Sequence, residues 1–312
     1  MLLKNVGALS LLFALPVIAV AQSPRGESVP RTPWGDPDLR GQWTNATTTP
    51  LERPDDLRDT AILTEEERAA RDPEFFDRIR FRHIYEVYME RGGLIRQTSL
   101  IVDPPDGRLP PLTPRAQARH DAFEARWQGL HASWEDTNMY ERCITRGLPG
   151  AMIPGFYNHN YLILQTPDHV VVQVEMIHDA RVIPLDGRPH APSRIRQWLG
   201  DSRGRWEGDT LVVETTNFTP KAEQRAHILV FTAFSTGRNL HLVERFTPID
   251  ADTIDYRFTV TDPTVYTRPW TAAIPMRRTE SPLYEYACHE GNYPMALGLS
   301  GARAEERARA AR

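Results

Sequence analysis

The sequence predicts a mainly β protein with an antiparallel barrel-like or sandwich body and a helical, Pro-rich N-terminal section. From residue 143 onward, short apolar or alternating segments are joined by turns that contain Asp, Gly and Pro, a pattern typical of antiparallel sheets. Segment 253–261 alternates between apolar and polar side chains, as a half-buried strand does. Before residue 143 the chain is richer in Pro, so we expect a less regular section there.

The N-terminus has the features of a secretory signal. Lys4, the apolar run 6–20 and the Ala19-Val20-Ala21 motif are typical of a cleaved signal peptide. An uncleaved anchor is the alternative, but the run is shorter than the roughly 20 residues of a spanning helix. We therefore expect a periplasmic or secreted protein with no membrane span after cleavage. The expected segments are a signal peptide at 1–21, an extended arm at 22–60, a helical or irregular section at 61–142, the β body at 143–300 and a charged tail at 301–312.

Two helices are expected before the β body. The capping box at 64–67 marks the start of the first, which should continue to about residue 91, either with or without a break at Pro73. Thr113, followed by Pro114 at the first helical position, marks the start of the second.

The β body should contain at least seven strands joined by short turns. The turn at 167–169 predicts a hairpin, and its second strand should run without interruption to residue 182. The expected strands are 161–166, 170–182, a strand that ends at 205–206, 210–218, 239–247, 253–261, 270–278 and 283–287.

The only two cysteines are Cys143 and Cys288. Export favours a disulfide between them, because secreted proteins fold in oxidising surroundings. Such a bridge closes a loop of well over a hundred residues, worth on the order of 4–5 kcal/mol in the chain-entropy model. A free catalytic thiol is the alternative, but neither cysteine lies in a thiol-protease context.

Charge and motifs exclude several function classes. The formal net charge of −4 gives no basic footprint for nucleic acid, so we expect no nucleic-acid partner. The sequence contains no G-x-S-x-G, P-loop, G-x-G-x-x-G, C-x-x-C or S-x-x-K motif. His289-Glu290 begins like a zincin helix, but Tyr293 stands where the second His would be. A common serine hydrolase, a nucleotide-dependent enzyme and a zincin are therefore disfavoured.

Segment 175–190 concentrates ionisable side chains directly after an apolar strand, where a rigid sheet can present them to a ligand. A strand that continues through residue 182 places Glu175, Asp179 and Arg181 on one face and His178 on the apolar face. His178 is then either a core histidine, or a residue that projects into a barrel lumen as a catalytic acid, a catalytic base or a metal ligand. Asp179 and Arg181 serve in one of two ways. They form a structural ion pair, or Asp179 orients Arg181 so that its guanidinium binds a carboxylate or polyol.

Two loops add further candidates. The turn at 185–190 carries Arg188 and His190. These residues either have only a structural role in the turn or belong to a binding site at the end of the sheet. Tyr157, Asn158 and His159 precede a strand, where they satisfy buried backbone or donate hydrogen bonds to a sugar or an oxyanion. The expected disulfide would bring this second loop close to His289.

A metal site is conceivable but not favoured. His159, His178, His190 and Glu175 have the donor atoms that zinc or iron needs, yet their spacing matches no known signature. We therefore expect no metal and no other cofactor.

Five longer phrases carry a family resemblance. They are RTPWGDPDLRGQW (31–43), RQTSLIVDPPDGRLPPLTP (96–114), IHDARVIPLDGRPH (177–190), GDSRGRWEGDTLVVETTNF (200–218) and YEYACHEGNY (284–293). Together they are similar to a widespread family of uncharacterised secreted bacterial proteins, which implies export but assigns no catalytic residue. Gly41-Gln42-Trp43 also resembles the G-x-W motif at the start of lipocalins, which makes a lipocalin-like or calycin-like barrel one form of the body.

These observations lead to one hypothesis and two alternatives. We expect an exported enzyme, a hydrolase, lyase or isomerase, that uses acid/base chemistry on a small hydroxylated or carboxylated compound such as a sugar or aromatic derivative. The alternatives are a barrel that carries a hydrophobic or amphipathic ligand and an envelope interaction protein. The oligomeric state stays open. The expected catalytic residues are His178, His190, Glu175 and Asp179, and the expected substrate-binding residues are Arg181, Arg188, Tyr157, Asn158, His159 and His289.

Overall fold

A computed structural model describes residues 29–77, 92–127, 133–155, 157–222 and 237–312. The signal peptide predicted at 1–21 and the continuation of the first helix over 78–91 lie outside these residues.

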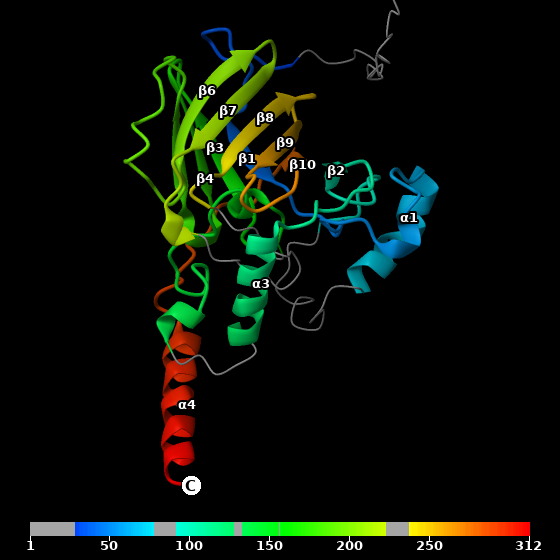
Figure 1. The fold of residues 1–312 in the computed structure, drawn as a ribbon. Coiled ribbons are helices and arrows are strands. Elements are labelled where there is room, and N and C mark those ends of the chain that lie inside the picture. The colour runs from blue at the N-terminus through cyan, green and yellow to red at the C-terminus, as the bar shows by residue number, and fades with distance from the viewer. Residues whose placement is uncertain (1–28, 78–91, 128–132, 156, 223–236) are drawn as a thin grey trace, which may run out of the picture.

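The body is an antiparallel, nearly closed barrel-shaped sheet of ten strands, which confirms the predicted fold class (Figure 1). The strand order is β5-β4-β3-β1-β10-β9-β8-β7-β6, and β2 pairs with β10 off this path. Gly204 lies against the Ile183 side chain, so glycine lets β6 approach β5 where the sheet nearly closes. The strands are β1 (Gly41–Thr44), β2 (Ile101–Asp103), β3 (Asn160–Gln165), β4 (His169–Val174), β5 (Ala180–Pro184), β6 (Asp201–Glu207), β7 (Thr210–Thr216), β8 (His241–Pro248), β9 (Thr253–Thr261) and β10 (Trp270–Arg278).

Three α-helices lie outside the sheet in the described residues, and both predicted helix starts are confirmed. Glu67 N–H donates to Thr64 Oγ1 at 3.2 Å at the start of α1, and Ala116 N–H donates to Thr113 Oγ1 at 3.2 Å at the start of α3. Figure 1 shows α3 and α4 extending from one end of the barrel. Within the described residues, no helix has the length and apolar character needed to cross a membrane. The helices are α1 (Glu65–Asp77), α3 (Pro114–Trp127) and α4 (Tyr293–Ala310), with short 3₁₀ turns η1 (Asp55–Leu57), η2 (Trp134–Asp136), η3 (Gly150–Met152), η4 (Met176–His178) and η5 (Pro220–Ala222).

The predicted strand 170–182 is wrong in its middle, because the 3₁₀ turn η4 separates β4 from β5. Ile177 and His178 adopt left-handed φ angles of 60° and 47°, which turn the chain and invert the alternation of side chains. Arg181 therefore points inward and is only 6% exposed, whereas Val182 is 59% exposed. His178 is exposed to solvent and does not follow the apolar face. The predicted strand at 283–287 is also absent, because that segment pairs with no strand of the sheet.

The interior of the barrel is filled by aromatic rings and one ion pair. Phe246, Tyr256, Phe258 and Trp270 form a chain of ring contacts with centroids 4.7–5.9 Å apart. Across the interior, Arg181 donates two hydrogen bonds to the carboxylate of the fully buried Glu244, at 2.5 and 3.0 Å. These side chains pack the space that a barrel-enclosed ligand would need.

The G-x-W motif lies in the inner strand β1, between β3 and β10. Trp43 is buried, and the Arg278 guanidinium lies 4.5 Å from the centre of its ring. Gly41 has a φ of 134°, and a side chain there would overlap the Arg278 guanidinium. This packing explains why the motif needs glycine two residues before the tryptophan.

Candidate functional site

The predicted disulfide is present and organises one end of the barrel. Cys143 and Cys288 are bonded, with Cα atoms 5.8 Å apart. The bridge holds segment 279–292, here called the strap, against the loops that lead into β3 and out of β4. Asn292 Nδ2 donates to the Glu141 carbonyl at 2.8 Å, which fixes the strap a second time.

Glu175 serves to hold this strap. Its buried carboxylate accepts hydrogen bonds from the Tyr284 backbone N–H at 2.8 Å and from Asn160 Nδ2 at 2.9 Å. Because one oxygen is engaged by the strap and the other by β3, we assign Glu175 a structural role at this site.

Asp179 lies at the same end of the barrel, and its Oδ2 accepts a hydrogen bond from Thr145 Oγ1 at 2.7 Å. Burial raises the pKa of the Asp179 carboxyl above its ordinary value of 3.8. His178 and His289 are exposed in the neighbouring loops.

Three other predicted site residues lie elsewhere. Arg181 is in the barrel interior with Glu244, and Arg188 pairs with Asp186 in an exposed turn. His190 Nδ1 lies 2.9 Å from Asp201 Oδ2 at the start of β6. The four residues considered for a metal do not converge, and the described part of the chain contains no group of three His, Cys, Asp or Glu side chains placed to hold one.

Arg146 is the feature that sequence analysis missed. Its side chain is only 3% exposed, and no described carboxylate forms an ion pair with it. Nη1 donates to His159 Nε2 at 2.7 Å, whereas Nε and Nη2 have no hydrogen-bond partner among the described residues. Buried charges in proteins are normally paired, so an Arg of this kind is compatible with a site that receives a negative group.

His159 is held neutral by its surroundings. Burial, and then the charge of Arg146, lower the pKa of His159 well below its ordinary value of 6.5. Neutral imidazole has a lone pair that accepts the Arg146 N–H, which agrees with the short contact. Gly155 packs directly against the imidazole ring, and a side chain at this position would overlap it.

Three tyrosines lie near Arg146. The Tyr140 hydroxyl lies 3.2 Å from the hydroxyls of both Tyr157 and Tyr286, and the Arg146 guanidinium lies 5.9 Å from the Tyr140 ring centre. Burial raises the pKa of Tyr286 to about 12 and raises that of Tyr140 as well. Both phenols therefore stay protonated at neutral pH and are available as hydrogen-bond donors.

These tyrosines line a cavity of about 570 Å³, here called the tyrosine cavity. Its size falls within the range typical of small-molecule sites. The strap supplies one wall, so the disulfide is part of the site. The lining residues are Thr137, Tyr140, Glu141, Tyr157, Glu285, Tyr286, Ala287, Cys288, Gly291, Asn292, Pro294 and Met295.

We expect His159 to make the protein less stable as the pH falls below about 6.5. The unfolded chain takes up a proton there, whereas the lowered pKa keeps His159 neutral in the folded protein. The unfolded state therefore binds more protons, and the free energy of unfolding falls by up to about 1.4 kcal/mol per pH unit. Urea unfolding at several pH values measures this slope. His159→Gln should flatten it, and an unchanged slope in that variant would show that His159 does not titrate in this way.

No protein-family model, curated protein or solved structure matches this chain.

Proposed function

We propose that the protein is an exported enzyme that binds a small hydroxylated or carboxylated compound in the tyrosine cavity and acts on it by acid/base chemistry. The observation that carries the proposal is the buried Arg146, which has no carboxylate partner among the described residues and lies close enough to Tyr140 and Tyr286 to interact electrostatically with both. The disulfide fits export, because such bonds persist in oxidising compartments.

The geometry supports distinct roles for these groups. The Tyr286 and Tyr140 hydroxyls donate hydrogen bonds to an oxygen of the compound, and Tyr286, which lies on the strap wall of the cavity and is bonded to Tyr140, is our candidate proton donor. The positive charge of Arg146 stabilises negative charge that develops on that oxygen, and its effect is strong because burial excludes water. The rings of Tyr157 and Tyr286 are stacked 6.5 Å apart beside this position, which favours a ring-shaped compound.

The two alternative functions have less support. A carrier would hold its ligand in the barrel lumen, where packed aromatic rings and the Arg181–Glu244 pair now lie. An interaction protein would expose aromatic residues of the N-terminal arm, but Trp43 is buried in the barrel and Trp34 is partly buried.

The test is a binding and conversion screen of the purified mature protein. Saturation-transfer NMR against monosaccharides, uronic acids and hydroxybenzoates detects binding, and new signals in the same samples detect conversion. We expect at least one compound to bind and to be converted. Binding without conversion would reduce the proposal to a binding protein, and the absence of both would overturn it.

Tyr286→Phe should lower the rate of this conversion by roughly 100-fold or more, because it removes the candidate proton donor but keeps the ring. Tyr284→Phe is the matched control, since Tyr284 lies on the same strap with a side chain that is 65% exposed and outside the cavity. Equal rates for the two variants would exclude Tyr286 as the proton donor.

A further inference from the structure

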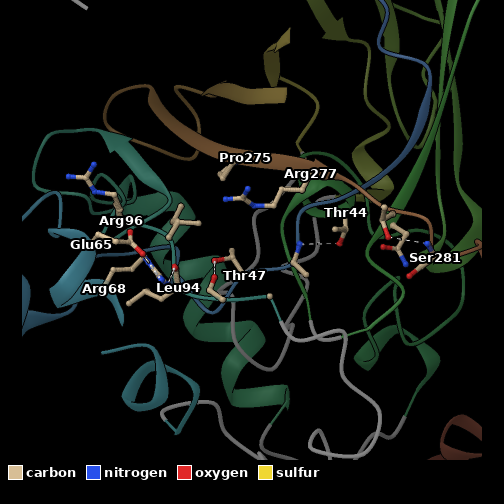
Figure 2. A pocket seen from close by; sticks show the side chains of 15 residues that line it. Thr44, Thr47, Glu65, Arg68, Leu94, Arg96, Pro275, Arg277 and Ser281 are labelled. Carbon is tan, nitrogen blue, oxygen red and sulfur yellow. Dashed lines mark hydrogen bonds and ion pairs between the residues drawn. The ribbon is translucent and has the colours of Figure 1, made fainter. Parts of the chain in front are cut away.

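A second cavity lies on the other side of the strap. It has a volume of about 820 Å³ and is bounded by α1, segment 92–96, β1 and β10 (Figure 2). We call it the arginine groove. Thr279 and Ser281 of the strap face this groove, whereas Tyr286 and Cys288 face the tyrosine cavity. The other lining residues are Thr44, Ala46, Thr47, Glu65, Arg68, Gly92, Gly93, Leu94, Ile95, Arg96, Asn160, Pro275 and Arg277.

The groove has an excess of positive charge. Arg68 pairs with Glu65 at 2.7 Å, which neutralises both. Arg96 donates Nε to the Leu63 carbonyl at 2.9 Å, but it forms no ion pair with a described carboxylate. Arg277 likewise forms no ion pair with any residue that the structure describes. The charge of Arg96 is partly balanced by the nearby Glu65 carboxylate, whereas Arg277 lacks a described counter-charge.

Arg277 differs in this respect from other exposed arginines of the sheet. Arg205 bonds to Glu214 and Arg257 bonds to Asp255, each at 2.8 Å. Arg245 bonds to Glu207 at 3.0 Å. In contrast, the cross-strand neighbours of Arg277 are two threonines, on β1 and β9. On a sheet that otherwise supplies its arginines with carboxylates, this position leaves a charge available to a ligand.

Hydroxyl groups complete the lining at the β1 and strap side. Thr44 Oγ1 accepts the Ala46 N–H at 3.3 Å, and Thr279 Oγ1 accepts the Ser281 N–H at 3.1 Å. Each hydroxyl is held in place by the bond that it accepts and keeps its own hydrogen to donate. Figure 2 shows Arg277 extending from β10 toward the side of the groove where Arg68 and Leu94 lie, whereas the Arg96 guanidinium is directed away from Arg277.

We propose that the arginine groove binds a small anion through its phosphate or carboxylate groups. Arg277 binds one charged group inside the groove, because a guanidinium donates paired hydrogen bonds to such oxygens. The threonine hydroxyls donate to the remaining oxygens, and Arg96, elsewhere in the lining, adds a weaker attraction at longer range. This site is separate from the tyrosine cavity and does not depend on the function proposed for it.

Isothermal titration calorimetry of the full mature chain with pyrophosphate and with citrate tests this site. We expect binding of at least one of the two, weakened at high salt, with Arg277→Gln raising the Kd by at least about tenfold and Arg96→Gln by a smaller factor. A preference for pyrophosphate over citrate would identify phosphate groups as the ligand chemistry, and the reverse would identify carboxylates.

The control is Arg268→Gln, which changes the net charge equally at the exposed segment before β10. Arg277 is exposed, so both variants should keep the melting temperature of the parent protein. If neither anion binds, or if Arg268→Gln weakens binding as much as Arg277→Gln, the groove is not an anion site.

Discussion

Replacing both cysteines, Cys143→Ser with Cys288→Ser, is expected to lower the free energy of unfolding by about 5 kcal/mol. The bridge joins residues 145 positions apart, and its removal restores the entropy of that long loop to the unfolded chain. Because domains of this size are stable by only about 5–15 kcal/mol, this is a large share of the total. Urea unfolding monitored by tryptophan fluorescence measures the change.

The loss of the disulfide should also abolish binding in the tyrosine cavity. Cys288 and Tyr286 form part of its wall, and the strap that carries them is held by the bridge. Reduction of the parent protein with dithiothreitol should reproduce both effects, and the same reagent should leave the double Ser variant unchanged. Reduced protein that keeps its stability to within about 1 kcal/mol would show that the bridge contributes little.

Glu244→Gln is expected to destabilise the protein by about 3–5 kcal/mol. The carboxylate of Glu244 is fully buried and accepts hydrogen bonds from Arg181 and from the Tyr256 hydroxyl. The substitution leaves the Arg181 charge in the barrel interior without its partner, and a buried uncompensated charge is costly. Glu207→Gln, which breaks exposed ion pairs on β6, is the control and should change stability little.

A triple variant separates charge from packing. Arg181→Met, Glu244→Leu and Tyr256→Phe together remove all the polar partners and keep the volume, so we expect most of the lost stability to return. A triple variant as unstable as Glu244→Gln would mean that the polar network itself is needed to form the barrel.

Much of the fold could be predicted because its signals are local. The capping box at 64–67 and the pair Thr113-Pro114 each mark a helix start within a few residues, and the hairpin at 167–169 follows from its turn. The disulfide could be predicted because the chain has only one pair of cysteines.

The orientation of segment 175–182 could not be predicted in this way. A β-branched residue such as Ile177 rarely adopts a left-handed φ, so its sequence gives no signal for the turn that inverts the alternation. A continuous strand would place His178 on the apolar face and Arg181 on the opposite face. The turn instead buries Arg181 and exposes His178.

The site was predicted only in part, for a different reason. Tyr157, Asn158 and His159 were singled out by their own loop, whereas Arg146 becomes notable only through its burial and its missing partners. Those are properties of three-dimensional packing between loops distant in the chain. The local sequence around Arg146 shows only a charged residue before a Gly/Pro turn.

The most direct measurement is the stability of Arg146→Met alongside its binding of the compound found by NMR. If Arg146 is kept for a ligand, replacing its unpaired buried charge by an apolar side chain should leave the free energy of unfolding within about 1 kcal/mol of the parent or raise it, and binding should be lost. The loss of the bond to His159 works against this gain but is smaller than the cost of the charge. A drop of about 3–5 kcal/mol with binding retained would show instead that Arg146 supports the fold and not the site.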